Sequence, residues 1–316
     1  MISAGGFLLA YFLSEEDPDG EQLRLALSDG AEPIFWTPLN DGQPVLRSGT
    51  GEGGVRDPFL IRDERSGRFI LLATDLKIGA GRDWNRATRR GSNAIIVWES
   101  ADLVTWQGPY RREVSAPEAG NTWAPKAFWS EQRSAWLVFW ASALYAPDAD
   151  RAAGSYQRMM VAETLDFRSF SAPEVYLDLG HDVIDASFLP HGDRWYRFSA
   201  NAQAPGGLAS RGNHIFIEAG TSLEDPAFEP LLEDLGKGVM QRAEGPAVAM
   251  DPLGERWYLL ADEFGLRGYQ LFSTTNLRAA DWHHVPEAVL PRGARHGSLL
   301  AITAKERTRL AGNVWM

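Results

Sequence analysis

Three acidic residues of this chain stand at the heads of short apolar runs that lie far apart in the sequence. They are Asp57 in GVRDPFLI, Asp185 in VIDASF and Glu244 in AEGPAV. Carboxyl groups serve enzymes as general acids and general bases, and a cluster of them keeps one member protonated while another stays ionised. If the fold brings the three together, one of them can donate a proton while another accepts one at the same pH.

The acidic runs recur in phase with a pattern that the chain repeats five times. Each unit has three short apolar segments and a polar turn that closes on Trp or Phe. The closing aromatics return every 54 to 70 residues, counted around the chain ends, and they are Trp36, Trp106, Phe170, Phe228 and Trp282. Repeats of about this length, built of short strands, are typical of β-propeller blades. The sequence therefore predicts an all-β fold, a five-bladed β-propeller.

Runs rich in Val, Ile, Phe, Tyr and Trp between Gly, Asp, Pro and Ser turns predict three strands in each unit. The first strands are expected at 56–61, 123–128, 185–190, 244–250 and 296–302. The second strands are expected to start at Gly6, Arg68, Ala135, Arg194 and Arg256, and the third strands at Gln22, Ala94, Arg158, His214 and Tyr269. Three longer irregular stretches, 79–92, 145–156 and 201–213, are expected to be surface loops that shape the mouth of a site.

The last unit is split between the two ends of the chain. Its first strand comes from the C-terminal region, and its other strands come from the N-terminus. Such an arrangement closes the ring and leaves no open seam of unpaired strand edges. Residues 1–316 are therefore predicted to form a single domain.

Composition excludes several kinds of partner and site. The formal net charge of -11 argues against nucleic acid or an anionic membrane as a partner, because both need a basic surface. The chain has no Cys, so it has neither disulfides nor a thiol nucleophile. No apolar run approaches the roughly 18 residues of a membrane span. A neutral ligand is compatible with all of these features.

The N-terminal segment 1–13 is apolar, but no basic residue precedes its apolar run. The acidic residues Glu15, Glu16 and Asp17 follow directly. We interpret this segment as a strand and not as a secretory signal peptide. The expectation is a cytoplasmic protein, or a secreted one if a leader has been removed.

In a propeller the first strand of every blade lines the central axis, so the heads of these strands meet at one mouth. Asp57, Asp185 and Glu244 are expected at three of the heads, and Trp123 and His296 at the other two. If the acids were only turn caps, the remaining heads should also be Asp, Asn or Ser. They are aromatic and imidazole side chains, which favours a catalytic role for the acids.

Taken in order and in phase, the five strings GVRDPFLI, WAPKAF, VIDASF, AEGPAV and RHGSLL resemble the blade-start motifs of glycoside hydrolase family 43. Members of that family are five-bladed propellers that cleave arabinose and xylose units from plant polysaccharides with inversion. The resemblance implies that Asp57 is the general base, Glu244 the general acid, and Asp185 the residue that orients this acid and tunes its pKa. One departure is Ala186, which stands where family members usually carry Pro.

The resemblance also implies groups that contact the sugar. Trp123 would stack on a sugar ring or fill the channel wall, and Arg56, Arg242 and Arg295 would bind hydroxyls, restrain a carboxylate or face solvent. His296 would lie below the sugar, where some members hold a calcium ion or a water cluster, or would be an ordinary buried histidine. A lone His lacks the oxygen ligands that calcium prefers. We therefore expect no metal site and no required cofactor, with calcium at His296 as the alternative.

The leading hypothesis is an inverting exo-glycosidase that releases terminal α-L-arabinofuranosyl or β-D-xylosyl residues, or both, from plant-derived oligosaccharides. One alternative is a five-bladed glycoside phosphorylase, in which Arg and His would hold phosphate. A retaining sucrose or fructan hydrolase is a second alternative, with its two main carboxyls closer together than in an inverting enzyme. A third is a non-catalytic, carbohydrate-binding propeller with vestigial acids.

Overall fold

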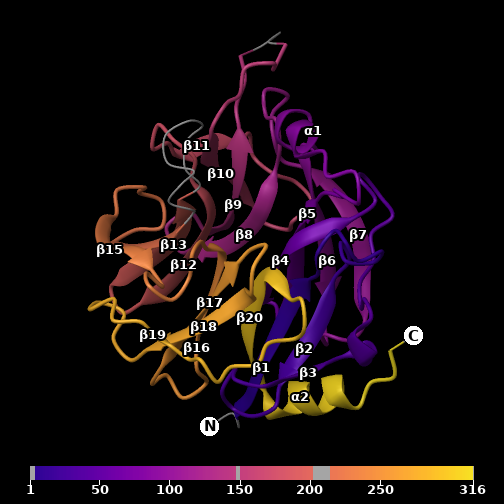
Figure 1. The fold of residues 1–316 in the computed structure, drawn as a ribbon, viewed down its shortest axis with the longest axis vertical. Helices are drawn as coiled ribbons and strands as arrows, with labels where there is room; N and C mark the ends of the chain where they lie inside the picture. The colour runs from indigo at the N-terminus through magenta and orange to yellow at the C-terminus, as the bar shows by residue number, and fades with distance from the viewer. Residues whose placement is uncertain (1–3, 147–149, 202–213, 316) are drawn as a thin grey trace.

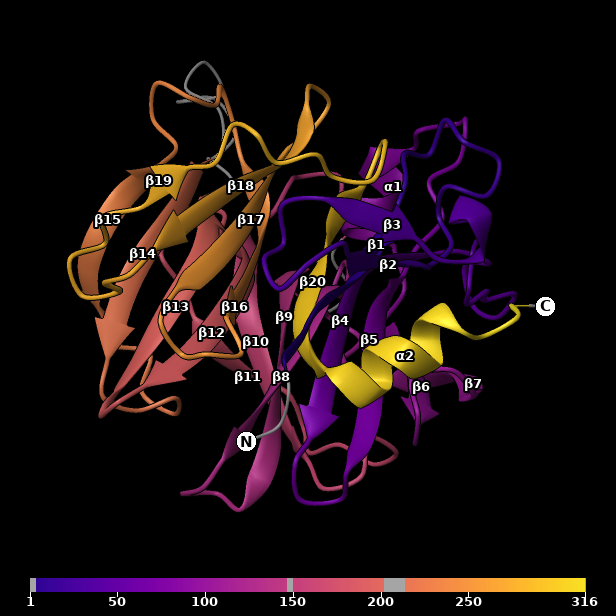
Figure 2. The same cartoon turned by 90° about the horizontal axis from the view of Figure 1, so that it is seen from below.

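Twenty strands form five antiparallel sheets around one axis in the computed structural model, which describes residues 4–146, 150–201 and 214–315 (Figures 1 and 2). We number the sheets as blades 1 to 5. From the axis outwards, their strands are β4 (Val55–Asp63), β5 (Arg68–Asp75), β6 (Ala94–Ser100) and β7 (Trp106–Glu113) in blade 1; β8 (Trp123–Ser130), β9 (Ala135–Ala143), β10 (Gln157–Thr164) and β11 (Glu174–Leu177) in blade 2; β12 (Ile184–His191), β13 (Arg194–Asn201), β14 (His214–Gly220) and β15 (Glu229–Leu235) in blade 3; β16 (Glu244–Met250), β17 (Trp257–Glu263), β18 (Gly268–Thr274) and β19 (His283–His284) in blade 4; and β20 (Arg295–Thr303), β1 (Ala4–Phe12), β2 (Arg24–Ser28) and β3 (Trp36–Pro38) in blade 5.

The predicted five-bladed propeller and its split closing blade are both confirmed. Strand β20 pairs antiparallel with β1, for example Leu300 with Leu8 and Leu299 with Leu9. Figure 1 shows these two strands side by side, although they come from opposite ends of the chain. Each inner strand also contacts the inner strands of both neighbouring blades, so the ring is continuous.

The structure adds a fourth strand to every unit, which the sequence reading did not predict. Trp36 and Trp106 begin the outer strands β3 and β7, while Phe170, Phe228 and Trp282 lie shortly before β11, β15 and β19. Several of these strands are very short, and their residues are partly exposed at the rim. An outer strand has one open edge and needs no long apolar run, so its sequence shows only a weak hydrophobic pattern.

Two α-helices and one 3-10 turn, Asn40–Gly42, were also missed. Helix α1 (Trp84–Arg89) lies inside the expected loop 79–92, and the Asp83 side chain caps it by accepting from the Arg86 backbone N–H. Helix α2 (Ala304–Ala311) follows β20 and packs on β1. Parts of the expected loops 145–156 and 201–213 lie outside the described residues. Neither described helix has the length and apolar character that crossing a membrane requires.

The core consists mainly of five apolar clusters, one between each pair of neighbouring blades. Trp98 and Phe12 belong to the cluster between blades 1 and 5, and Trp140 to the one between blades 1 and 2. Because both faces of a blade are covered, its middle strands are apolar on both sides, as in β9, where all nine residues are buried. Burial of each large side chain contributes about 1.5–3 kcal/mol, which holds the blades at fixed angles.

Candidate active site

Each inner strand contains a β-bulge near its start, and the five bulges lie at the same place in the repeat. The pairing slips between Arg56 and Phe59 in β4, and equivalent slips occur in β8, β12, β16 and β20. Asp57 and Asp185 are bulge residues with positive φ values of 52° and 62°. Such a conformation costs a non-glycine residue about 1–3 kcal/mol and is often found at functional sites. The same backbone device thus positions both aspartates.

We expected the three acids at equivalent positions of the repeat. Glu244 differs from the two aspartates, because it lies one position before the bulge. The bulge residue of β16 is Gly245, with a φ of 60°. A Cβ atom there would lie 2.5 Å from the imidazole of His296, so a larger residue cannot occupy this position. Blade 4 therefore lies close to His296 at Gly245, and its acidic side chain is that of the preceding residue, Glu244.

Asp57 is a buried carboxylate with polar partners on both oxygens. The Thr74 hydroxyl donates to its Oδ2 at 2.7 Å and accepts from the Ala124 backbone N–H, also at 2.7 Å. The Nδ1 of His296 lies 3.1 Å from its Oδ1. Burial by itself raises the pKa of Asp57, but the charge and hydrogen bond of His296, with Arg56 and Thr74, hold this pKa well below its usual range. Asp57 is therefore ionised and able to accept a proton.

Asp185 connects the cluster to the backbone of blade 4. Its Oδ2 accepts a hydrogen bond from the Gly245 backbone N–H at 2.9 Å and lies 3.8 Å from the Nδ1 of His296. Burial and the nearby charge of Asp57 raise the pKa of Asp185, against the opposing charges of His296 and Lys126. Since Gly245 follows Glu244 directly, Asp185 holds the segment that carries this glutamate.

Glu244 has the most exposed side chain of the three acids, at 19%. Burial, followed by the charges of Asp262 and Asp185, raises its pKa to about 7, although Arg295 acts in the opposite direction. The Nη2 of Arg295 donates to Glu244 Oε1 at 2.9 Å, and its Nε donates to Asp262 Oδ2 at 3.1 Å. Glu244 thus keeps a proton up to neutral pH while Asp57 does not.

Of the predicted sugar-contacting arginines, only Arg295 contacts one of the three candidate catalytic acids. Arg56 is buried and donates from Nη1 to Glu21 at 3.1 Å and to Glu15 at 3.4 Å. Its guanidinium group lies between the rings of Phe12 and Trp84, 4.7 Å and 5.0 Å from their centroids. Its guanidinium group is therefore held by two carboxylates and two aromatic rings. Arg242 stacks on the ring of Phe264, at 4.6 Å.

Trp123 has an aromatic neighbour that the sequence reading did not single out. Trp84 of helix α1 meets Trp123 edge to face, with ring centroids 6.2 Å apart, and remains 39% exposed. Glu21 anchors the loop before this helix by accepting from the backbone N–H groups of Ile78 and Gly79. The sequence did contain a sign of this role, because Trp84 lies in the loop 79–92 that was expected to shape the mouth. Exposed tryptophans in such loops are often binding residues.

The described residues around His296 do not form the oxygen cage that calcium prefers, although the Nε2 of His296 is buried without a hydrogen-bond partner among them. Within the described residues, no group of three or more His, Cys, Asp and Glu side chains is arranged to hold a metal. Calcium prefers six to eight oxygen ligands, whereas the oxygens of Asp57 already have partners. Asp185 and Asp57 raise the pKa of His296 against the effect of burial. Lys126 is also buried, and burial lowers its pKa against the charges of Asp185 and Asp57.

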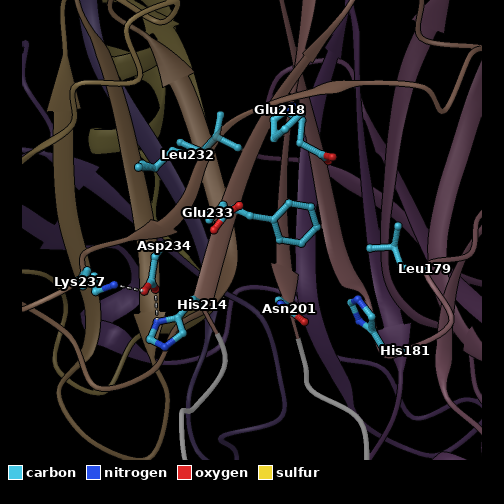
Figure 3. A pocket seen from close by; sticks show the side chains of 12 residues that line it. Leu179, His181, Asn201, His214, Glu218, Leu232, Glu233, Asp234 and Lys237 are labelled. Atoms are coloured by element: carbon cyan, nitrogen blue, oxygen red, sulfur yellow. Dashed lines mark ion pairs between the residues drawn. The ribbon is translucent and has the colours of Figure 1, made fainter. Parts of the chain in front are cut away.

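A separate surface pocket of about 440 Å³ lies on blade 3 (Figure 3). It is formed by the outer strands β14 and β15 and by the segment around His181, not by the inner strands. Asp234 at its edge is paired with His214 and Lys237. None of the three candidate catalytic acids lines this pocket, so we do not assign the hydrolytic site to it.

Comparison with known proteins gives the family. A family model described as a probable glycosyl hydrolase domain, related to family 43, matches residues 3–308. An α-L-arabinofuranosidase from Bifidobacterium longum subsp. longum is 31% identical over 239 residues, which cover 71% of this chain and 22% of the relative. The chain thus spans about a fifth of the length of this curated relative.

Solved structures show the same fold at low sequence identity. An α-L-arabinofuranosidase from Fusarium graminearum aligns with a TM-score of 0.57 and 16% identity, covering 92% of this chain and 80% of that one. An exo-1,5-α-L-arabinanase from a bovine ruminal metagenomic library has a TM-score of 0.56 and 13% identity, covering 84% and 89%. These structural similarities show a shared fold only, whereas the family model matches the sequence itself. The chain therefore belongs to the glycosyl hydrolase family related to family 43, as its blade-start motifs indicated.

Proposed function

We propose that this chain is an inverting exo-glycosidase that releases terminal α-L-arabinofuranosyl or β-D-xylosyl residues, or both, from plant-derived oligosaccharides. The observation that carries the proposal is the difference in pKa between two acids on inner strands of the ring. Glu244 has a pKa of about 7, and Asp57 has a pKa well below the usual range for Asp. Two carboxyl groups held in different protonation states are what general acid and base catalysis requires at one pH.

The proposed reaction is a single displacement. Asp57 removes a proton from a water molecule, whose oxygen attacks the anomeric carbon, while Glu244 gives its proton to the departing glycosidic oxygen. The carbon–oxygen bond to the leaving group breaks as the bond to water forms, so the anomeric configuration inverts. Asp185 supports the acid, because it holds the Gly245 backbone N–H and because its charge raises the pKa of Glu244.

The choice of sugar rests on the relatives. The curated relative is named an α-L-arabinofuranosidase, which supports a terminal arabinofuranosyl group. Release of xylosyl residues is proposed from the family resemblance, since the two pentoses present similar hydroxyl patterns, and exo action is part of the same proposal. A neutral oligosaccharide also suits a chain with a formal net charge of -11.

The contacts of the arginines disfavour a phosphorylase. Such an enzyme needs cationic groups that are free to hold phosphate. Here Arg56 is paired with Glu15 and Glu21, and Arg295 is paired with Glu244 and Asp262. The carboxylates would also repel a bound anion.

The test uses nitrophenyl α-L-arabinofuranoside and β-D-xyloside, with proton NMR of the first anomer released. We expect turnover without phosphate, an inverted product, and a loss of about 10²–10⁴ in kcat for Asp57→Asn. Glu113→Gln, which changes an exposed acid on β7, is the matched control. Failure to cleave either sugar, with Asp57→Asn matching wild type in every measurement, would refute the proposal.

A further inference from the structure

Glu15 lies in the turn that follows β1, the strand that closes the ring with β20. Ser14 holds this turn, because its carbonyl oxygen accepts from the Asp17 backbone N–H at 3.1 Å and its hydroxyl accepts from the Glu16 backbone N–H at 3.2 Å. The side chain of Glu16 is 72% exposed, whereas that of Glu15 is only 11% exposed. A carboxylate that is mostly removed from water needs cationic partners.

Glu15 has arginine partners from three different parts of the chain. Its Oε2 lies 3.4 Å from Nη1 of Arg56 on β4 and 3.8 Å from Nη1 of Arg295 on β20. Its Oε1 lies 4.0 Å from Nε of Arg82, which precedes α1. Arg56 and Arg295 also face the same ring, that of Phe12, with their guanidinium carbons 4.7 Å and 5.7 Å from its centroid. One oxygen of Glu15 is therefore shared by two cations that repel each other.

Arg295 connects Glu15 to the proposed acid. The Nη2 of Arg295 donates to Glu244 Oε1 at 2.9 Å, and its Nε donates to Asp262 Oδ2 at 3.1 Å. Its remaining nitrogen, Nη1, is the one that faces Glu15. The single positive charge of Arg295 is thus shared among three carboxylates from three different segments of the chain.

We propose that Glu15 is a positioning residue that binds the guanidinium group of Arg295 at Nη1 and thereby weakens the attraction between Arg295 and Glu244. Burial lowers the pKa of Arg295, but the charges of Asp262, Glu244 and Glu15 raise it overall. Burial raises the pKa of Glu15, but a backbone hydrogen bond and the charges of Arg56 and Arg295 lower it overall. Glu15 is therefore ionised at the pH at which Glu244 titrates.

The other charged groups around these contacts stay in place when Glu15 is changed. They are Glu21, 3.1 Å from Arg56; Glu16, paired with Arg82; and Asp262, Asp185 and His296, which act on the pKa of Glu244 together with its burial and Arg295. Without the charge of Glu15, Arg295 should attract Glu244 more strongly. Glu244 should then lose its proton at a lower pH than in wild type.

The first test measures the titration of Glu244 without any substrate. Carbon-13 NMR of protein labelled at the glutamate carboxyl carbons, assigned with Glu244→Gln, is expected to show Glu244 titrating about half a pH unit lower in Glu15→Gln. Glu16→Gln removes the same formal charge from an exposed neighbour and should leave this titration unchanged. A Glu244 titration that is unchanged or raised in folded Glu15→Gln, or lowered equally in Glu16→Gln, would overturn the proposal.

The second test asks whether Glu15 acts through Arg295. In the Arg295→Gln background, adding Glu15→Gln should leave the Glu244 titration where it is, because the shared cation is already gone. If Glu15→Gln instead lowers the titration equally with and without Arg295, Glu15 acts on Glu244 directly and the proposal is wrong.

The inference rests on the proposed function only for its effect on the reaction. If pentosides are turned over, the midpoint on the basic side of the kcat/KM profile should fall with the Glu244 titration in Glu15→Gln and stay at the wild-type value in Glu16→Gln. A midpoint that stays while the titration moves would count against Glu244 as the acid, not against the role of Glu15. If no pentoside is cleaved, the proposed function fails, and the carboxyl titrations still decide the role of Glu15.

Discussion

The imidazole of His296, from the last strand of the ring, lies with its Nδ1 3.1 Å from Oδ1 of Asp57 on the inner strand of blade 1. Both side chains are buried, so each depends on the other for compensation of its charge. This pair joins the C-terminal strand β20 to blade 1 and holds the proposed base ionised.

Breaking this pair should destabilise the fold in a pH-dependent way. Asp57 has a lowered pKa, so its stabilising contribution is present above about pH 3.9 and is lost as the pH falls towards its folded pKa. His296 has a raised pKa, so its contribution is complete below about pH 6.5 and is lost as the pH rises through its folded pKa.

At pH 5.5 both contributions are present, and His296→Gln should reduce the free energy of unfolding by about 3–5 kcal/mol. Adding Asp57→Asn to His296→Gln should cost less than the sum of the two single changes. Urea unfolding of the four proteins checks this, with His284→Gln as the control. Additive effects would show that the two side chains are not coupled.

Glu244→Gln should lower the rate of hydrolysis by an amount that depends on the basicity of the leaving group. A general acid matters most when the departing oxygen is basic, so the loss should be about 10²–10⁴ for alkyl-linked arabinosides and small for a dinitrophenyl glycoside. Steady-state kinetics on both substrates provide the comparison. Equal losses on both would argue against the assignment of Glu244 as the acid.

On the basic limb of the pH profile, kcat/KM should fall with a midpoint near pH 7. Glu244 has a pKa of about 7, and it loses the proton that it must donate as the pH rises through this value. Arg295 lowers this pKa, and its removal also leaves the charge of Asp262 uncompensated. Arg295→Gln should therefore move the limb up by about one pH unit. Arg62→Gln, which breaks the ion pair with Glu306 of helix α2, should leave the limb unchanged.

Trp84→Ala should weaken substrate binding more than catalysis. The exposed ring of Trp84 meets Trp123 at the start of the inner strand β8. An aromatic contact contributes about 0.5–1.5 kcal/mol, so KM should rise about threefold to tenfold with little change in kcat. Phe35→Ala removes an exposed aromatic ring of blade 5 and should leave KM unchanged. A fall in kcat at constant KM would show that Trp84 acts on the chemistry instead.

Thr303→Ala should reduce the stability of the fold without affecting the site. The Thr303 hydroxyl accepts from the Glu306 backbone N–H, and the Glu306 carboxylate accepts from the Thr303 backbone N–H, so the pair forms a capping box for α2. Loss of such a cap costs about 1 kcal/mol. Thermal unfolding measures the loss, and kcat should equal that of wild type. A loss of activity in the folded variant would show that α2 influences the acids.

The second strands of the blades could be predicted because their side chains are buried on both faces. The runs RFILLATD and AWLVFWASA keep an unbroken apolar pattern, and the structure places β5 and β9 there. The outer strands were missed because the two residues of β19 and the three of β3 carry almost no periodicity. Helix α1 was missed because a single capped turn of six residues depends on its local contacts more than on a pattern.

By itself, the sequence determined the number of blades and the place of ring closure, and it predicted three acids near the starts of inner strands, because each of these is a pattern that recurs along the chain. Only the tertiary structure decided which acid keeps its proton and which cations oppose the others. That division depends on side chains from different blades, such as His296 beside Asp57 and Arg295 beside Glu244. Charges interact through space, and in a ring the groups that meet at the axis are separated by whole blades in the sequence.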